Sequence, residues 1–146
     1  MPLLQKILIK YHNPDLKHID TIEKGDWIDL RAAEKINLKA GEAYKISLGV
    51  SMQLPPGYEA HVRPRSSTFK TWKILLVNSM GVIDNSYNGD NDIWFFEALA
   101  IEDTTICVND RICQFRIVEK QPTIQFETVE HLGNSDRGGY GSTGTN

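Results

Sequence analysis

Short apolar segments recur along the chain, and several of them alternate apolar and polar residues with a period of two. Alternation of this kind is typical of strands that have one buried and one exposed face. Turn-forming residues separate the segments, as in PPG at 55–57 and NSYNGDND at 85–92. The pattern predicts strands at 6–12, 44–55, 58–64, 73–78, 93–102, 111–120 and 123–130. Many short strands with such turns favour an all-β sandwich or barrel.

Three local patterns add detail to this outline. The segment SSTFKTWK at 66–73 predicts one or two helical turns with a serine as N-cap. Apolar pairs flank the four residues NSMG at 78–81, which predicts a hairpin with a four-residue loop. Beyond Leu132 the sequence becomes rich in glycine and polar residues. We therefore expect a β domain at 1–132 and a glycine-rich mobile tail at 133–146.

Composition and charge limit the classes of function. The chain has 146 residues, of which 40% are hydrophobic and 24% charged, as expected for one globular domain. The net charge is −3, so the chain lacks the general basic surface that favours nucleic acid. No apolar run approaches the ~20 residues of a membrane span, and the N-terminus does not resemble a signal peptide. We expect a cytoplasmic protein that binds neither nucleic acid nor membrane.

The two cysteines, Cys107 and Cys113, do not indicate a metal site. Their C-x5-C spacing matches no common zinc pattern, and no histidine stands at ligand spacing beside them. Both lie among apolar neighbours. We expect them to be reduced residues of the core.

Three segments carry candidate chemistry, and each has a simpler structural interpretation. Arg65, Ser66 and Ser67 precede the predicted helix, where they form either a phosphate site or a capped turn with a solvated arginine. The predicted hairpin offers backbone groups for a base edge. Asp84 directly after it is either a general base or a turn residue.

The third candidate segment is the tail at 137–146. Its glycines formally satisfy G-x-G-x-x-G at 139–144, but the chain ends two residues later, so no helix can follow as a dinucleotide site requires. The remaining interpretations are a disordered terminus or a flexible loop that closes around phosphate. In the second, Arg137 supplies a forked donor and Tyr140 a ring that covers a base.

Five segments, in order, resemble the motifs of the trimeric dUTP diphosphatase (dUTPase) family. They are GDWIDLRAA (25–33), PRSS (64–67), NSMGVIDNSYNGD (78–90), DRICQFRI (110–117) and RGGYGSTG (137–144). The resemblance implies a distorted jelly-roll-like β-barrel with one short helix, and a homotrimer with shared active sites. It also implies Mg2+-assisted hydrolysis of dUTP to dUMP and pyrophosphate, which lowers dUTP and supplies dUMP for thymidylate synthesis.

The same resemblance assigns a role to each matching residue. Asp84 would activate the water that attacks the α-phosphorus, with a pKa raised by the nearby anion. Asp29 would lie near the water shell of Mg2+. The ion itself would be held by the phosphates of the substrate. Uracil and deoxyribose would contact Asn78, Gly81, Val82, Ile83 and Tyr87. The triphosphate would contact Arg65, Ser66, Ser67, Gln114, Arg137, Ser142 and Thr143, while Tyr140 would cover the base.

The sequence departs from the family pattern most clearly in its first and fifth motifs. Trp27 and Ile28 precede Asp29 where relatives carry a small residue and an aromatic one, and only two glycines separate Arg137 from Tyr140. The alternative enzyme is a dCTP deaminase, whose chemistry requires a glutamate where Trp94 stands. A non-enzymatic alternative is a dUTP-sensing module whose tail governs a protein partner.

Overall fold

The computed structural model describes residues 4–19 and 24–139, and it is all-β apart from one short helix. The fold class expected from the sequence is therefore confirmed. The helix α1 spans Thr68–Trp72. The strands are β1 (Leu8–Tyr11), β2 (Ile28–Leu30), β3 (Ile36–Leu38), β4 (Ala43–Ser47), β5 (Val50–Gln53), β6 (Tyr58–Pro64), β7 (Ile74–Leu76), β8 (Gly81–Ile83), β9 (Phe95–Ala100), β10 (Thr104–Ile106) and β11 (Cys113–Glu119).

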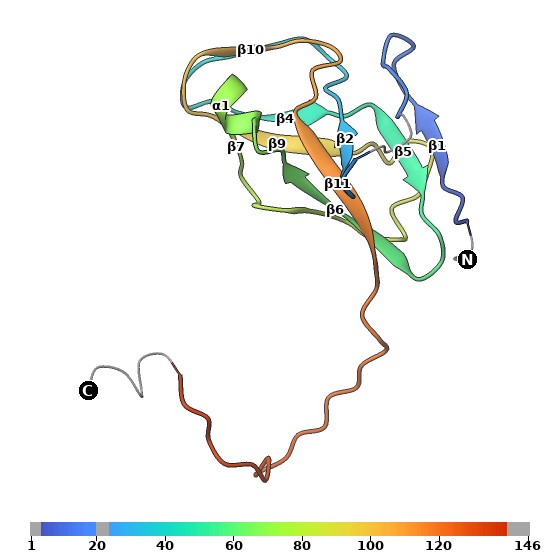
Figure 1. Cartoon of the computed structure of the whole chain (residues 1–146), viewed down its shortest axis with the longest axis vertical. Coiled ribbons are helices and arrows are strands. Elements are labelled where there is room, and N and C mark those ends of the chain that lie inside the picture. Colours follow the sequence, from blue (N-terminus) through green and yellow to red (C-terminus); the bar gives the residue numbers. More distant parts are fainter. Residues whose placement is uncertain (1–3, 20–23, 140–146) are drawn as a thin grey trace.

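The strands form four antiparallel sheets around a common core (Figure 1). The largest has the order β2-β11-β6-β8, and a second has the order β4-β9-β7; β1 pairs with β5, and β10 with β3. Large apolar side chains fill the interior. Trp94 and Phe115 meet edge to face there, with ring centroids 5.2 Å apart. This packing fixes the position of β11, which carries one wall of the site described below.

The apolar run at 44–55 divides into two strands at Gly49. This glycine has φ +65°, and a Cβ on it would lie 2.6 Å from the Cβ of Ala33. Both constraints exclude a side chain at this position. The sharp corner lets β4 and β5 join different sheets, which the alternation of apolar residues alone does not reveal.

The hairpin predicted around 78–81 is wrong. β7 pairs with β9 and β8 pairs with β6, so the two strands on either side of the loop belong to different sheets. A tight turn connects them, in which Ser79 donates its N–H to the carbonyl of Leu76 and has φ +57°. The turn itself was correctly located, but tertiary pairing determines which strand each arm joins.

The strand predicted at 123–130 is also wrong for the single chain. After β11 the polypeptide leaves the body as an extended segment without secondary structure (Figure 1). Its apolar side chains are exposed, with Phe126 at 92% and Leu132 at 86%. The segment has the alternation of a strand but pairs with no strand among residues 4–19 and 24–139.

The two cysteines differ in environment. Cys113 is fully buried on β11, as expected, and burial raises the pKa of its thiol. Cys107 is exposed, so its expected place in the core is wrong. It opens a turn in which its N–H donates to the carboxylate of Asp110, and Asn109 has φ +75°. The turn directs the chain away from the core at this position.

Candidate active site

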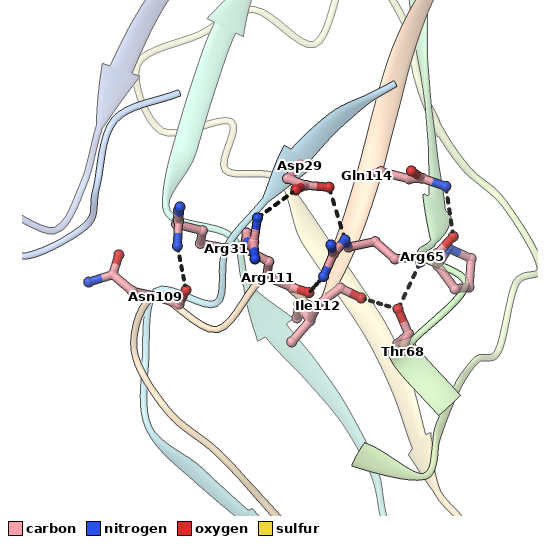
Figure 2. Close-up of polar contacts among 9 residues, drawn as sticks. Asp29, Arg31, Arg65, Thr68, Asn109, Arg111, Ile112 and Gln114 are labelled. Carbon is pink, nitrogen blue, oxygen red and sulfur yellow. Dashed lines mark hydrogen bonds and ion pairs between the residues drawn. The ribbon is translucent and has the colours of Figure 1, made fainter. Parts of the chain in front are cut away.

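Asp29 on β2 lies between two arginines from distant parts of the chain (Figure 2). Its Oδ1 is 3.0 Å from Nε of Arg65, and its Oδ2 is 3.4 Å from Nη1 of Arg111. Arg65 also donates from Nη1 to the main-chain carbonyl of Arg111 at 3.0 Å. Two arginines share the single carboxylate of Asp29, so the cluster keeps an excess of positive charge at the end of β6.

The buried hydroxyl of Thr68 fixes the backbone at Arg65. Thr68 Oγ1 accepts the N–H of Arg65 at 2.7 Å and donates to the carbonyl of Ile112 at 2.8 Å. Its side chain has no exposed surface. Ser67 is the N-cap of α1, as expected of a serine at this position, but its side chain makes no capping hydrogen bond. The Ser66 side chain is exposed beside it.

Gln114 joins this cluster through the register of the sheet. On β11 it lies opposite Asp29 of β2 on one side and Arg63 of β6 on the other. Its Nε2 donates to the carbonyl of Pro64 at 3.2 Å. The structure therefore brings together Arg65, Gln114 and Asp29, with Ser66 and Ser67 next to Arg65 at the start of α1.

A cavity of about 240 Å3 opens on the Arg111 side of Asp29. Its basic lining residues include Lys17, Lys24, Arg31 and Arg111, and its acidic lining residue is Asp29. Arg31 is held by a hydrogen bond from Nη1 to the carbonyl of Asn109. This end of the molecule is locally positive although the net charge of the chain is −3. Local fields of this kind attract polyanions.

The first-motif residues that depart from the family pattern also have a structural role. Arg116 on β11 forms an ion pair with Asp26 at 2.8 Å, and its guanidinium lies 5.7 Å from the ring centroid of Trp27. These contacts tie the segment before β2 to the outer face of β11. Asp29 is thus placed from both sides, by the sheet register and by the anchored tryptophan.

The candidate base-binding segment lies at an edge of the large sheet. Among the described strands β8 pairs with β6 alone, so it is an edge strand whose other side offers backbone groups to a ligand. Gly81 lets β8 approach β6 closely. A side chain at position 81 would place its Cβ only 3.2 Å from the Cβ of Val62. Val82 is 57% exposed, and Asn78 is exposed in the turn before the strand. Ile83 packs against the core and completes the segment.

Asp84 follows β8 and is exposed. Its Oδ1 accepts hydrogen bonds from Oγ of Ser86 at 2.6 Å and from N of Ser86 at 2.8 Å. These bonds hold the pKa of the Asp84 carboxyl below its usual value, and the charge of Lys120 lowers it further. In the chain itself the serine thus stabilises the ionised form, and the raised pKa expected beside an anion stays a prediction.

Tyr87 is anchored rather than free. Its hydroxyl donates to the carbonyl of Ile93 at 2.7 Å, and its ring packs partly against the core. Burial raises the pKa of this hydroxyl. Arg137 lies in the exposed extended segment, while Tyr140, Ser142 and Thr143 lie outside the described residues.

One chain does not bring Asp84 to the arginine cluster. Ile83 lies opposite Ala60, so Asp84 is level with Glu59 at one end of β6, while Arg65 follows the other end. Glu59 and Arg65 are six positions apart, which is about 20 Å along a strand. The candidate residues thus form two groups, one at each end of β6.

Three residues of the site were not singled out from the sequence. They are Thr68, which holds Arg65, Arg111, which shares Asp29, and Ser86, which holds Asp84. Arg111 and Ser86 lie inside the quoted motifs, and Thr68 directly follows one. Their roles depend on which side chains meet in three dimensions, and spacing gives no sign of that.

Comparison with known proteins identifies the family of the chain. The family model described as dUTPase matches residues 27–145. The SPbeta prophage-derived deoxyuridine 5'-triphosphate nucleotidohydrolase YosS of Bacillus subtilis is 57% identical over 140 residues, covering 96% of this chain and 99% of that protein. The relative from Finegoldia magna, a deoxyuridine 5'-triphosphate nucleotidohydrolase, is 40% identical, covering 95% of this chain and 97% of its own.

Solved structures show the same fold at low sequence identity. A mutant dUTPase of Staphylococcus bacteriophage 80alpha, solved with dUpNHpp, has a TM-score of 0.77 at 17% identity, covering 96% of this chain and 99% of that chain. The family model matches most of the sequence. The matched range contains the second to fifth motifs in full, and the first motif except for its first residues. The chain therefore belongs to the dUTPase family, the dUTP diphosphatases.

Proposed function

We propose that this enzyme hydrolyses dUTP to dUMP and pyrophosphate by attack of water on the α-phosphorus, with Asp84 as the general base. The observation that carries the proposal is the Asp84 carboxylate itself. It is exposed at the edge of β8, with one oxygen held by Ser86. An ionised carboxylate in this state accepts a proton from water. Its product dUMP would serve thymidylate synthesis.

The arginine cluster would bind the triphosphate. Arg65 and the exposed Ser66 offer donors at the start of α1, and Ser67 keeps its hydroxyl unused by the helix. Gln114 lies beside them on β11. Phosphoryl transfer depends on positioned donors of this kind, since charge spreads over the phosphate oxygens in the transition state. Arg137, Ser142 and Thr143 of the tail would close over the outer phosphates, with Tyr140 over the base.

The free edge of β8 supports selection of uracil. Backbone N–H and C=O groups of Gly81, Val82 and Ile83, with the Asn78 side chain, would pair with the base edge. Cytosine carries a donor where uracil carries an acceptor, and a mismatch of this type discriminates by ~10⁴-fold. Tyr87 is fixed by its bond to Ile93, so its ring would exclude a ribose 2′-hydroxyl.

A homotrimer with shared sites accounts for the distance between Asp84 and Arg65. If each site takes its base from one subunit and its phosphate donors from another, the gap of about 20 Å within one chain is no obstacle. The outer face of the β4-β9-β7 sheet supports assembly, because Leu75 and Val77 project from it and are about half exposed. The exposed C-terminal segment offers a strand to a neighbour.

Magnesium fits this site only with help from the substrate. Among residues 4–19 and 24–139, no three His, Cys, Asp or Glu side chains gather as a metal site. Both oxygens of Asp29 already contact arginines, so this carboxylate would reach the ion through water. Bound to the phosphates, Mg2+ would neutralise charge and orient them. The related dUTPase of phage phi11 of S. aureus (TM-score 0.75, 16% identity, covering 87% of this chain and 98% of that one) has a structural Mg(II) ion.

The test is release of pyrophosphate from dUTP, dTTP, dCTP and UTP, each with Mg2+ and with EDTA in its place. We expect turnover of dUTP alone, and only with the metal. Release of ammonia from dCTP would instead identify a deaminase, and absence of turnover with all four would contradict the proposal.

A further inference from the structure

The carboxylate of Asp84 is held through one oxygen only. Ser86 donates to Oδ1 twice, from its hydroxyl at 2.6 Å and from its backbone N–H at 2.8 Å. Over residues 4–19 and 24–139, Oδ2 accepts no hydrogen bond. Hydrogen bonds to an ionised acceptor at this length are strong. They fix the rotation of the carboxylate, so Oδ2 alone is available to a ligand or water.

The backbone beneath this pair is anchored on the turn between β5 and β6. The side-chain amide of Asn85 donates to the carbonyls of Pro55 at 2.9 Å and Tyr58 at 2.8 Å. In the same turn, Gly57 accepts the backbone N–H of Lys120 at 2.9 Å. Segments 84–86 and 120 are thus tied to one short loop. The position of the carboxylate is set by the fold before substrate arrives.

We propose that Ser86 is a positioning residue for hydrolysis: it occupies Oδ1 of Asp84 and thereby reserves Oδ2 as the atom that takes the proton from water. The inference rests on the proposed function of Asp84. In the reaction, the oxygen of water bonds to the α-phosphorus while its proton passes to Oδ2. The bond from the α-phosphorus to the bridging oxygen breaks, and pyrophosphate leaves with the electron pair.

The hydroxyl of Ser86 also affects the charge state of the base. It is the largest influence that holds the pKa of Asp84 low, and Lys120 acts in the same direction. Glu59 is level with Asp84 on β6, and its carboxylate is bound to Nε2 of His61 at 2.6 Å. Lys120, Glu59 and His61 are all retained when Ser86 is substituted. Bound triphosphate adds negative charge and raises the pKa of Asp84 in the complex, which brings its titration into a measurable range.

The test compares Ser86→Ala and Ser86→Thr with the wild type, with kcat measured against pH at saturating dUTP and Mg2+. Asp84 must be ionised to act, and removal of the hydroxyl raises its pKa, so the acid limb of Ser86→Ala should move to higher pH. At mildly acid pH kcat should fall about fivefold, with KM changed less than about twofold. Ser86→Thr keeps a hydroxyl, so its kcat and the acid limb of its pH profile should both match those of the wild type.

Each outcome has a definite meaning. A fall in kcat with an unmoved acid limb, despite an unchanged thermal midpoint, would show a structural role and overturn the inference. Wild-type behaviour of Ser86→Ala would overturn it as well. Failure of the proposed function is recognised separately, by full activity of Asp84→Asn. The 13C chemical shift of the Asp84 carboxyl, titrated without substrate, adds a readout independent of turnover, and should give a higher pKa in Ser86→Ala.

Discussion

The candidate base Asp84 is held by its immediate neighbour in the chain, because both hydrogen bonds to its carboxylate come from Ser86. In the segment DNS at 84–86, the aspartate is the proposed base, the asparagine anchors the backbone and the serine binds one oxygen of the carboxylate. The identity of Asp84 as a candidate followed from the sequence motif. Its lowered pKa did not, because the sequence does not show that the Ser86 hydroxyl turns toward it. Cys107 illustrates the same limit, since apolar neighbours suggested burial but the local turn exposes it.

The residue-scale prediction concerns Asp84→Asn. The amide cannot accept the proton from water, so kcat should fall by about 10²- to 10⁴-fold. Binding of a non-hydrolysable dUTP analogue, measured by calorimetry, should remain in the micromolar range because the base acts in the transition state. Asp90→Asn, an exposed aspartate in the following loop, is the matched control and should keep wild-type kcat. Equal loss of binding and turnover in Asp84→Asn would argue against its role as base.

At the scale of elements, the sequence located most strands but not their partners. The runs that became β1, β6, β9 and β11 were confirmed, because each combines alternation with clear turn signals. The loop at 78–81 was found, yet its arms joined different sheets. Partner choice is decided by packing across the core, as where Gly81 allows β8 to approach Val62. Local periodicity contains no information on that contact.

The element-scale prediction concerns the junction of β6, α1 and β11 at Thr68. Thr68→Val keeps the shape but leaves the N–H of Arg65 and the carbonyl of Ile112 without their partner. A buried unsatisfied group costs about 1–3 kcal/mol, so the free energy of unfolding should fall by about this amount in urea titrations. Arg65 should also be held less well, and KM for dUTP should rise. Thr71→Val, exposed on the same helix, should leave both quantities near wild type.

At the scale of the whole molecule, the single chain is an incomplete structure. The segment at 123–130 has the pattern of a strand but extends from the body with Phe126 almost fully exposed. Asp84 and Arg65 lie at opposite ends of β6. The sequence motifs indicated which residues are candidates for the site, but sequence spacing does not show that Asp84 and Arg65 lie apart within one chain. We propose one explanation for both features, which is assembly of shared sites across subunits.

Removal of residues 137–146 tests the role proposed for the tail. Residues 137–139 are exposed, and in the described part of the chain the buried cluster ends at Phe115, with partly buried contacts at Ile117. The thermal midpoint and the oligomeric state by light scattering should therefore match those of the full chain. Turnover of dUTP should fall by at least about tenfold, because the outer phosphates lose their closing segment. Normal turnover by the shortened chain would refute the lid.

The central claim is that each site combines Asp84 of one subunit with Arg65 of another, and mixed trimers test it most directly. Asp84→Asn and Arg65→Gln chains, each inactive alone, are co-expressed with different tags and purified through both tags. If sites are shared, one of the three sites in each doubly tagged trimer carries both intact residues, so dUTP hydrolysis should return to about a third of the wild-type level. Tagged mixtures of Asp84→Asn chains alone should stay inactive. Doubly tagged trimers of the two variants that remain inactive would contradict the account.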